Sequence, residues 1–366
     1  EQVSAEDIKN RKDLRNVFTL TIDPLDARDF DDALSVEELK NGECEIGVHI
    51  ADVSHYVQPG GALDREAQRR GNSTYLVGEV VPMLPHRLSS GICSLVEGEE
   101  RLVKSVFFVF SKEGKVIRSK ITESVILSDK RLTYEQAGLF LRENDLEAIK
   151  SAKPPPSRYS GNPGKTLDEI SNTLLENLQL NIRKIASLAS LLRTERMRKG
   201  SLDLESMEVK ILVDDKGEPE KILQSESDES HHMIEEFMLL ANERVAVELR
   251  KQKLPGVFRV HPDPDPENLE ELRAFLQIFG ISCGELTGRK EVTKMLNAMN
   301  KHPLAQVLRI KFLRSLKQAC YRSTPDGHYG LAKNDYLHFT SPIRRYADLI
   351  VHRTIEGHVR GNKRKK

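Results

Sequence analysis

Short runs of β-branched and aromatic residues between turn signals dominate the first 130 residues, a pattern typical of strands. Residues 17–23, "VFTLTID", predict one such strand. The segments "DDALSVEEL" and "CEIGVHIAD" flank "KNGE", so we expect them to pair as a hairpin. Residues 101–127 predict a second hairpin that turns at Glu113-Gly114. The first third of the chain is therefore expected to be strand-rich.

Helical periodicity begins at "LTYEQAGLFLRE" and returns through most of the remaining chain. The longer helical patterns lie at residues 166–198, 229–252, 266–279, 289–300 and 303–319. Residues 209–223 interrupt them with the pattern of a third hairpin. The Pro/Gly/Ser-rich segment 151–165 predicts a loop. Because a long helical pattern follows it directly, we interpret this loop as a connection within one domain.

Two places carry a capping residue followed by proline, which is a helix-start signal. They are Asp265-Pro266, in "HPDPDPENLEEL", and Ser341-Pro342, in "HFTSPIRRYADL". We expect a helix to begin at each proline.

A helix starting at Pro342 would place Arg344 in its first turn. Asp348, one turn later, could then orient Arg344, while Arg345 would point about 100° away around the helix. Cations at a helix N-terminus oppose the helix dipole, which favours anions there. A phosphate bound at this end would explain the arrangement, since free backbone amides also attract it.

Composition narrows the class of protein. The 366 residues are 38% apolar, and no run of eighteen apolar residues predicts a membrane span. The start of the chain is polar and lacks an apolar signal segment. Four cysteines without a CxxC pair suit the reducing cytoplasm, where we expect the protein. Lys+Arg and Asp+Glu are equal at 56 each, so global charge gives no nucleic-acid signal, and the basic end "RGNKRKK" could be a solvated tail or a binding arm.

The most unusual segment is "DPLDARDFDDA", residues 23–33. It holds five aspartates, Asp23, Asp26, Asp29, Asp31 and Asp32. Turns and caps often use a single aspartate, but five packed together repel one another. A calcium loop would need a glycine at its sixth position and a late glutamate, and this segment has neither. Hard oxygen ligands in an open site suit Mg²⁺, and two such ions can activate water for phosphoryl transfer. Together with Arg344, the segment indicates metal-assisted phosphodiester hydrolysis.

Four stretches resemble the RNase II / RNase R (RNB) family of exoribonucleases. They are "TIDPLDARDFDDALS", "IGVHIADVSHYVQPG", "YLVGEVVPMLPHRLSSGICSL" and "HYGLAKNDYLHFTSPIRRYADLIVHR". The resemblance runs from about residue 10 to residue 357 and is closest to RNase R-like members, because "HFTSPIRRYAD" matches their form. It implies an α+β fold, with a mixed, largely antiparallel sheet and surrounding helices that form an RNA channel. It also implies processive, Mg²⁺-dependent hydrolysis of single-stranded RNA from the 3′ end, which releases 5′-nucleoside monophosphates.

The resemblance carries roles to individual residues. The aspartates implied to hold Mg²⁺, with two ions during catalysis, are Asp23, Asp29, Asp31 and Asp32. Asp31 and Arg344 are implied to be catalytic, and the residues implied to contact RNA are Tyr75, Arg344 and Arg345. We interpret Asp26 as a turn residue. The alternative for Tyr75 is a half-buried strand tyrosine. No membrane and no small-molecule cofactor are implied.

The chain departs from the family in two ways. Pro264 stands about where RNase II has a phenylalanine that clamps RNA. The family's catalytic domain also continues past the arginine segment and supplies a further glutamate, whereas this chain ends at Lys366. Cold-shock and S1 domains are not in the sequence. We therefore expect residues 1–366 to be an RNB-type catalytic domain that is incomplete at its C-terminal end.

Two further groups of residues could contribute to a site. His231 with Glu235, and His232 with Glu236, have the i,i+4 spacing of metal ligands on a helix, although polar surface groups show the same spacing. The residues expected to support the aspartates by hydrogen bonds are His49, Asp52 and His55.

Two other function classes stay open beside the exoribonuclease. One is a non-catalytic RNA-binding module of the same fold, and the intact aspartates and arginine argue against it. The other is a two-metal DNA nuclease, which the match to RNA enzymes disfavours.

Overall fold

A computed structural model describes most of the chain, and its contacts divide the chain into two units. The described residues are 3–77, 79–152, 164–202, 208–213, 218–225 and 228–361. The larger unit comprises Glu1–Leu192, Met207–Val245 and His338–Lys366, and the smaller unit comprises Arg193–Ser206 and Ala246–Leu337.

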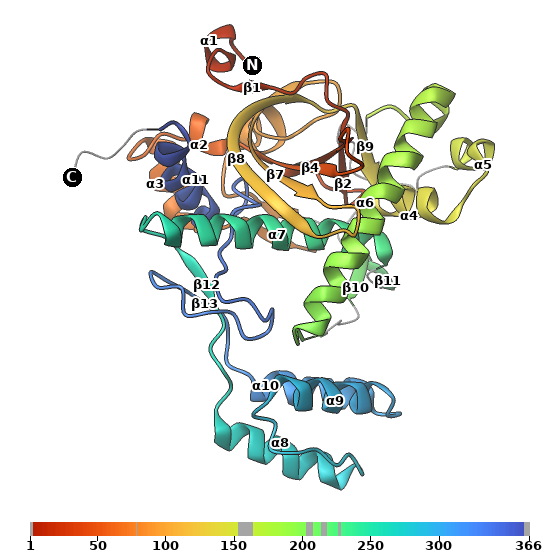
Figure 1. The fold of residues 1–366 in the computed structure, drawn as a ribbon, viewed down its shortest axis with the longest axis vertical. Coiled ribbons are helices and arrows are strands. Elements are labelled where there is room, and N and C mark those ends of the chain that lie inside the picture. Colours follow the sequence, from red (N-terminus) through yellow and green to blue (C-terminus); the bar gives the residue numbers. More distant parts are fainter. Residues whose placement is uncertain are drawn as a thin grey trace. The chain divides into compact units, whose positions relative to one another are not determined.

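A seven-stranded sheet forms the centre of the larger unit (Figure 1). Its strand order is β1-β8-β7-β4-β3-β2-β9. The strands are β1 (Lys12–Asp13), β2 (Thr19–Asp23), β3 (Asp32–Glu38), β4 (Cys44–Ala51), β7 (Glu100–Phe110), β8 (Val116–Leu127) and β9 (Lys130–Thr133). Only β1 with β8 and β2 with β9 run parallel. The expected α+β fold with a largely antiparallel sheet is confirmed, as are the strand at 17–23 and the first two hairpins.

Helices and smaller hairpins complete the larger unit. The helices are α1 (Ala5–Ile8), α2 (Val53–Tyr56), α3 (Ala62–Arg70), η1 (Leu88–Ile92), α4 (Tyr134–Arg142), α5 (Leu146–Ser151), η2 (Leu167–Glu169) and α11 (Tyr346–Val359), and α6 (Asn172–Arg198) and α7 (Glu229–Lys251) start in this unit. Two hairpins pair β5 (Thr74–Leu76) with β6 (Glu79–Val81) and β10 (Glu208–Val213) with β11 (Pro219–Ser225). The latter is the third expected hairpin. Most of the expected loop at 151–165, and the last five residues of the basic end, lie outside the described residues.

The sheet is covered because its central strands are apolar on both faces. All but the first residue of β7 are buried, and so are all but one of β4. The β7–β8 hairpin bends around the other strands (Figure 1). Phe110 of β7 meets Phe237 of α7 edge to face, with ring centroids 6.3 Å apart, so α7 packs on this sheet.

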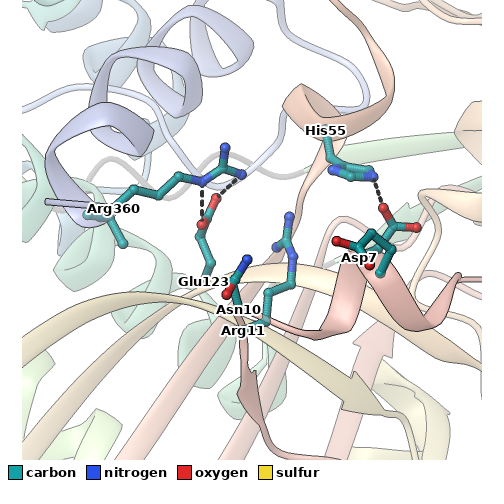
Figure 2. A pocket seen from close by; sticks show the side chains of 8 residues that line it. Asp7, Asn10, Arg11, His55, Glu123 and Arg360 are labelled. Atoms are coloured by element: carbon teal, nitrogen blue, oxygen red, sulfur yellow. Dashed lines mark hydrogen bonds and ion pairs between the residues drawn. The ribbon is translucent and has the colours of Figure 1, made fainter. Parts of the chain in front are cut away.

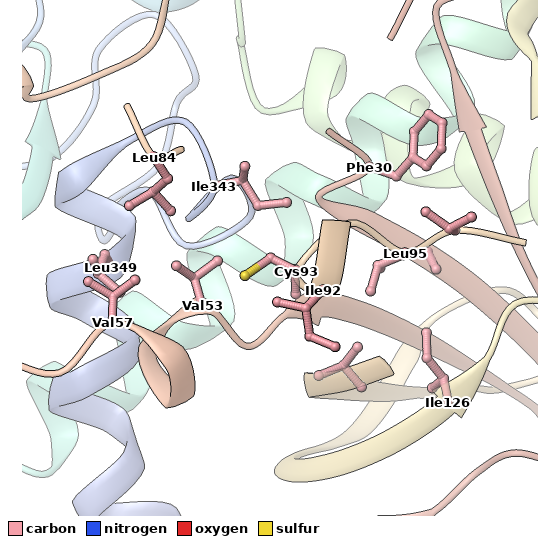
Figure 3. Packing of buried hydrophobic residues seen from close by; sticks show 14 of the residues in the cluster. Phe30, Val53, Val57, Leu84, Ile92, Cys93, Leu95, Ile126, Ile343 and Leu349 are labelled. Carbon is pink, nitrogen blue, oxygen red and sulfur yellow. The ribbon is translucent and has the colours of Figure 1, made fainter. Parts of the chain in front are cut away.

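One apolar cluster joins segments that lie far apart in the sequence (Figure 3). Phe30 comes from the aspartate segment, and Ile343 comes from the arginine segment. Val53 and Leu349 contribute from α2 and α11. Both Phe30 and Ile343 are almost fully buried, so each fixes the backbone beside a charged residue.

The smaller unit has its own core, built on three helices. Its elements are β12 (Phe258–Val260), α8 (Pro266–Ile278), α9 (Arg289–Asn300), α10 (Ala305–Ser315) and β13 (Cys320–Arg322). The expected start at Pro266 is confirmed, with Asp265 as the N-cap residue, although the Asp265 carboxylate pairs with Lys317 at 2.6 Å. The helix expected at 303–319 is shorter in the structure, where α10 covers Ala305–Ser315.

The expected helix start at Pro342 is wrong. Ser341 to Arg345 form a turn, and α11 begins at Tyr346. Arg345 is the N-cap residue and has extended backbone angles, φ −132° and ψ 122°. Its backbone forms an antiparallel bridge with Asn72, and this partner holds the chain out of the helix. Arg344 therefore lies in a turn rather than in a helix.

Along the described residues, no helix combines the length and apolarity needed to cross a membrane.

Buried charges link the sheet to the helices beside it. The Asp52 carboxylate accepts hydrogen bonds from Lys104 at 2.6 Å, Arg11 at 2.7 Å and Ser54 at 2.7 Å. Burial alone would raise the pKa of Asp52, but Lys104 and Arg11 more than offset it and hold the pKa well below its usual range. A lowered pKa means that this carboxylate stabilises the fold above pH about 4, and that the contribution is lost at more acidic pH.

The Asp52→Asn variant tests this ion network. It keeps the shape of the side chain but removes the carboxylate nearest to Lys104 and Arg11. The anions left near Lys104 are then Glu123 and Glu356, at 3.7 and 3.6 Å. We expect the free energy of unfolding at pH 7 to fall by about 3–5 kcal/mol. Urea denaturation measures the change. Glu66→Gln is the control, because Glu66 pairs with Arg69 and Arg70 on the surface of α3. An equal loss in both variants would contradict the prediction.

Candidate active site

The ends of two neighbouring strands bring the aspartates together. Asp23 is the last residue of β2 and Asp32 is the first residue of β3. Because β2 and β3 are antiparallel, these ends lie at the same edge of the sheet. The connecting loop adds Asp29 and Asp31. We call these four residues the acid cluster.

The Ser94 hydroxyl group helps to fix the loop that carries the acid cluster. Ser94 Oγ accepts a hydrogen bond from the Phe30 N–H and donates one to the carbonyl of Arg28, both at 3.0 Å. With the Phe30 ring buried in the core, the two neighbouring aspartates cannot turn freely. Asp26, by contrast, lies in an exposed turn, as expected.

Asp31 joins the aspartate segment to the arginine segment. The Ile343 N–H donates to its Oδ1 at 2.9 Å, and Arg344 Nε lies 3.5 Å from its Oδ2. The carboxylate is almost completely buried. Asp31 therefore sits where both unusual stretches of the sequence meet.

Burial raises the pKa of three members of the acid cluster. The pKa values of Asp23 and Asp31 lie well above the usual range, and that of Asp32 rises to about 6. Desolvation is the largest cause in each case, and for Asp23 the charge of Asp32 adds to it. Arg344 acts in the opposite direction on Asp31 and Asp32. The cluster thus strongly favours the approach of positive charge.

The carboxylates fit a hard divalent cation. Asp23 Oδ2 and Asp31 Oδ2 are buried and accept no hydrogen bond from the described residues. Such unsatisfied anionic oxygens are costly unless a cation approaches. Within the described ranges, no three His, Cys, Asp or Glu side chains are placed so that they could hold a metal ion together. A bound ion would keep water or substrate oxygens as further ligands, as Mg²⁺ usually does.

Tyr75 lies beside the acid cluster on β5. Its hydroxyl donates to Asp29 Oδ2 at 2.8 Å. Tyr75 lies in a strand and is 51% exposed, so the structure agrees with the half-buried strand tyrosine and also leaves the ring accessible for an RNA contact. The ring is available to a ligand while its hydroxyl holds a carboxylate.

The two arginines have different partners. The Arg344 side chain is 46% exposed, and Nη2 donates to Ser341 Oγ at 3.2 Å. The expected pairing of Arg344 with Asp348 is wrong. Asp348 instead accepts two hydrogen bonds from Arg345, at 2.9 and 2.8 Å. Without a helix at 342–345, the i,i+4 geometry that would have joined Arg344 to Asp348 does not exist.

The expected supporting residues point to other partners. His49 bonds Ser35 and Ser105 within the sheet, at 2.8 Å each. Asp52 belongs to the buried ion network, and His55 pairs with Asp7 at 3.0 Å. These three residues therefore stabilise the scaffold, and the expectation that they support the acid cluster is wrong.

The sequence did not single out two residues near the acid cluster. Arg131 of β9 donates to the carbonyl of Pro24 at 2.7 Å, and its charge lowers the pKa of Asp23. Burial, with the charges of Asp32 and Asp23, raises the pKa of Tyr134 well above its usual range. The Tyr134 ring stacks on His231, with centroids 3.9 Å apart. Only the parallel pairing of β9 with β2 brings Arg131 and Tyr134 here, and no local pattern predicts that pairing.

A cavity of about 570 Å³ lies elsewhere in the larger unit (Figure 2). Its charged lining residues already pair: Arg360 with Glu123, and His55 with Asp7. Arg11, also in its lining, bonds Asp52. No member of the acid cluster lines this cavity, so we do not consider it the active site.

Comparisons with known proteins agree with the sequence motifs. A model of the RNB domain matches residues 11–361. Ribonuclease R of Thermotoga maritima is 42% identical over 364 residues, which is 99% of this chain and 48% of that protein. Ribonuclease R 1 of Lactococcus lactis is 39% identical over 359 residues, covering 97% of this chain and 41% of that protein.

A solved structure matches as well. Mycoplasma genitalium RNase R, in complex with ribose methylated single-stranded RNA, superposes with a TM-score of 0.86 at 30% identity. The match covers 98% of this chain and 53% of that one. The chain thus spans about half the length of the relatives that it matches.

The raised pKa values predict how a cation affects stability. The carboxylates of the unfolded chain lose their protons at about pH 4. Without a cation, Asp32 of the folded protein keeps its proton up to a pKa of about 6. The acid cluster therefore lowers stability as the pH rises through this window. A cation binds the deprotonated carboxylates, so we expect added Mg²⁺ to raise the melting temperature more at pH 7.5 than at pH 5. Thermal melts at matched ionic strength measure this, and an equal shift at both pH values would contradict it.

Proposed function

The chain belongs to the RNB domain family, and on that premise we propose that it carries the catalytic site of an exoribonuclease that hydrolyses single-stranded RNA from the 3′ end. The relatives named Ribonuclease R and the RNA-bound structure support this proposal. So does one observation: a cluster of four aspartates, two of them buried with unsatisfied oxygens, faces an arginine. We further propose that cleavage is processive and releases 5′-nucleoside monophosphates.

The acid cluster would hold Mg²⁺, with two ions during catalysis. Bound Mg²⁺ supplies Lewis-acid stabilisation of charge on the scissile phosphate and lowers the pKa of water. The chain's own residues place these charges. Asp23 and Asp31 offer unsatisfied oxygens, and the Ile343 amide keeps Asp31 from turning away. Asp29 is held by the Tyr75 hydroxyl.

Arg344 and Tyr75 would bind the substrate. A guanidinium group can contact two phosphate oxygens at once, and about half of the Arg344 side chain is exposed for that purpose. The exposed Tyr75 ring can stack on a base, an interaction worth about 1–3 kcal/mol. Arg345 is a weaker candidate for RNA contact, since Asp348 takes two of its donors.

The runner-up is a non-catalytic RNA-binding module of the same fold. It predicts RNA binding without hydrolysis. All four aspartates and Arg344 are present and brought together, which favours catalysis.

The four cysteines carry free thiols, which supports the cytoplasmic location that we propose.

Asp31→Asn tests the proposed catalysis. The change removes one charge and almost no volume. We expect hydrolysis of labelled single-stranded RNA with Mg²⁺ to fall by several orders of magnitude while RNA affinity changes little, because the carboxylate acts mainly in the transition state. EDTA should stop the wild type, and single-stranded DNA should remain intact.

Asp26→Asn is the matched control for Asp31→Asn. Asp26 lies in the same segment but in an exposed turn, so its variant should retain wild-type activity. If Asp31→Asn kept more than about a tenth of the wild-type rate, a difference under about 1.4 kcal/mol, Asp31 would not be catalytic.

Two substitutions of Tyr75 separate its ring from its hydroxyl. Tyr75→Ala removes the stacking surface, so we expect the final oligonucleotide to change in length while cleavage continues. Tyr75→Phe keeps the ring and loses the bond to Asp29, so the product length should stay the same while the Mg²⁺ requirement rises. Product ladders on a denaturing gel across a Mg²⁺ series measure both. An unchanged ladder for Tyr75→Ala would leave Tyr75 with only the Asp29 contact.

A further inference from the structure

A buried carboxylate binds both ends of the turn of residues 341–345, which is also closed by backbone hydrogen bonds to the Ser341 carbonyl. Asp348 is fully buried, and its Oδ1 accepts the Ser341 N–H at 2.8 Å. The same carboxylate takes Arg345 Nη2 on Oδ1 and Nε on Oδ2. Asp348 therefore ties the first residue of the turn to the last, and it does so from the first turn of α11.

The middle of this turn faces the acid cluster. Ile343 donates its N–H to Asp31, and Arg344 places its guanidinium beside the same carboxylate. Ser341, which Asp348 holds through its backbone, also accepts from Arg344 Nη2. Ile343 and Arg344, which contact Asp31, thus lie between Ser341 and Arg345, the two residues that Asp348 binds.

The turn also holds the base of the Tyr75 hairpin. Ser73 donates its N–H to the carbonyl of Arg344 at 2.9 Å, and Tyr346 donates its N–H to the carbonyl of Gly71 at 2.9 Å. Tyr75 follows two residues after Ser73, in β5. A shift of the turn would therefore move Tyr75 together with Arg344.

We propose that Arg345 and Asp348 are positioning residues of the active site, which act through Arg344 and Asp31 and do not touch the substrate. This inference rests on the proposed function and deepens it. It assigns Arg345 a role different from the RNA contact that the sequence implies. The Asp348 side chain binds both ends of a turn whose two middle residues contact Asp31, and it does so in addition to the backbone hydrogen bond from the Arg345 N–H to the Ser341 carbonyl at 3.0 Å.

A double-mutant cycle with Arg344→Lys tests the proposal. Arg345→Lys keeps the charge but cannot reproduce the two-point contact with Asp348. We expect it, and Asp348→Asn, to lower kcat by at least about tenfold, because positioning is lost, while RNA affinity changes by less than about threefold. In the Arg344→Lys background each should cost less than about a further threefold, since the group to be positioned is already impaired.

The cycle separates three roles for Arg345. Losses that multiply in the double variant would mean that Arg345 acts independently of Arg344, and would overturn the proposal. A variant that binds RNA more weakly at unchanged kcat would also overturn the proposal. If the salt dependence of its RNA affinity fell by about one phosphate contact, Arg345 would be an RNA ligand. Arg360→Lys is the control for a purely structural loss, because Arg360 makes the same two-point contact with Glu123 at the other end of α11. It should lower the melting temperature and leave kcat unchanged.

A second readout keeps this test separate from the proposed function. A wild-type protein that does not hydrolyse RNA would overturn the exoribonuclease proposal alone. The placement of Asp31 is then measured by titration calorimetry with Mg²⁺. We expect Arg345→Lys and Asp348→Asn to weaken Mg²⁺ binding by about tenfold, an effect typical of residues that orient metal ligands. Unchanged Mg²⁺ affinity in folded variants would overturn the positioning role.

Discussion

The mutual repulsion and desolvation of the clustered carboxylates is the constraint on which the larger unit depends. Asp23 and Asp31 are buried, and each has an oxygen that accepts no hydrogen bond from the described residues. This placement is unfavourable, so the rest of the fold must hold both side chains in position. Apolar anchors provide that restraint. Phe30 and Ile343 stand beside the charged residues of their segments and share one core. The positive charge of Arg344 relieves part of the repulsion, and a divalent cation would relieve more.

Much of the fold follows from local patterns. The hairpins of β3–β4 and β7–β8 are predicted by runs of strand-forming residues around short turns, which need no information from distant residues. The four aspartates and Arg344 also stand out in the sequence, because their spacing fits no ordinary turn or calcium loop. The start of α8 at Pro266 is predicted correctly for the same reason, since a proline at the first helical position acts within a single turn.

The failures arise where distant partners override a local signal. The Ser341-Pro342 pair has the same form as Asp265-Pro266, yet the chain stays extended at Arg345, where the backbone bridges Asn72 and the side chain binds Asp348. Residues that reach the acid cluster only through strand pairing are not predicted by the local sequence either. Arg131 and Tyr134 reach the acid cluster only because β9 lies parallel to β2, an arrangement that no short motif encodes.

The hydrogen bond from Ile343 to Asp31 spans 312 residues of sequence. During synthesis on the ribosome, Asp31 is made long before the amide that holds it, and at about 5–20 residues per second the delay lasts tens of seconds. Until the arginine turn emerges, the acid cluster lacks both its amide donor and Arg344. The growing chain therefore cannot assemble this site until the segment that holds Ile343 and Arg344 has been made. A contact between residues so far apart in the sequence makes the completed acid cluster a late product of chain synthesis and folding.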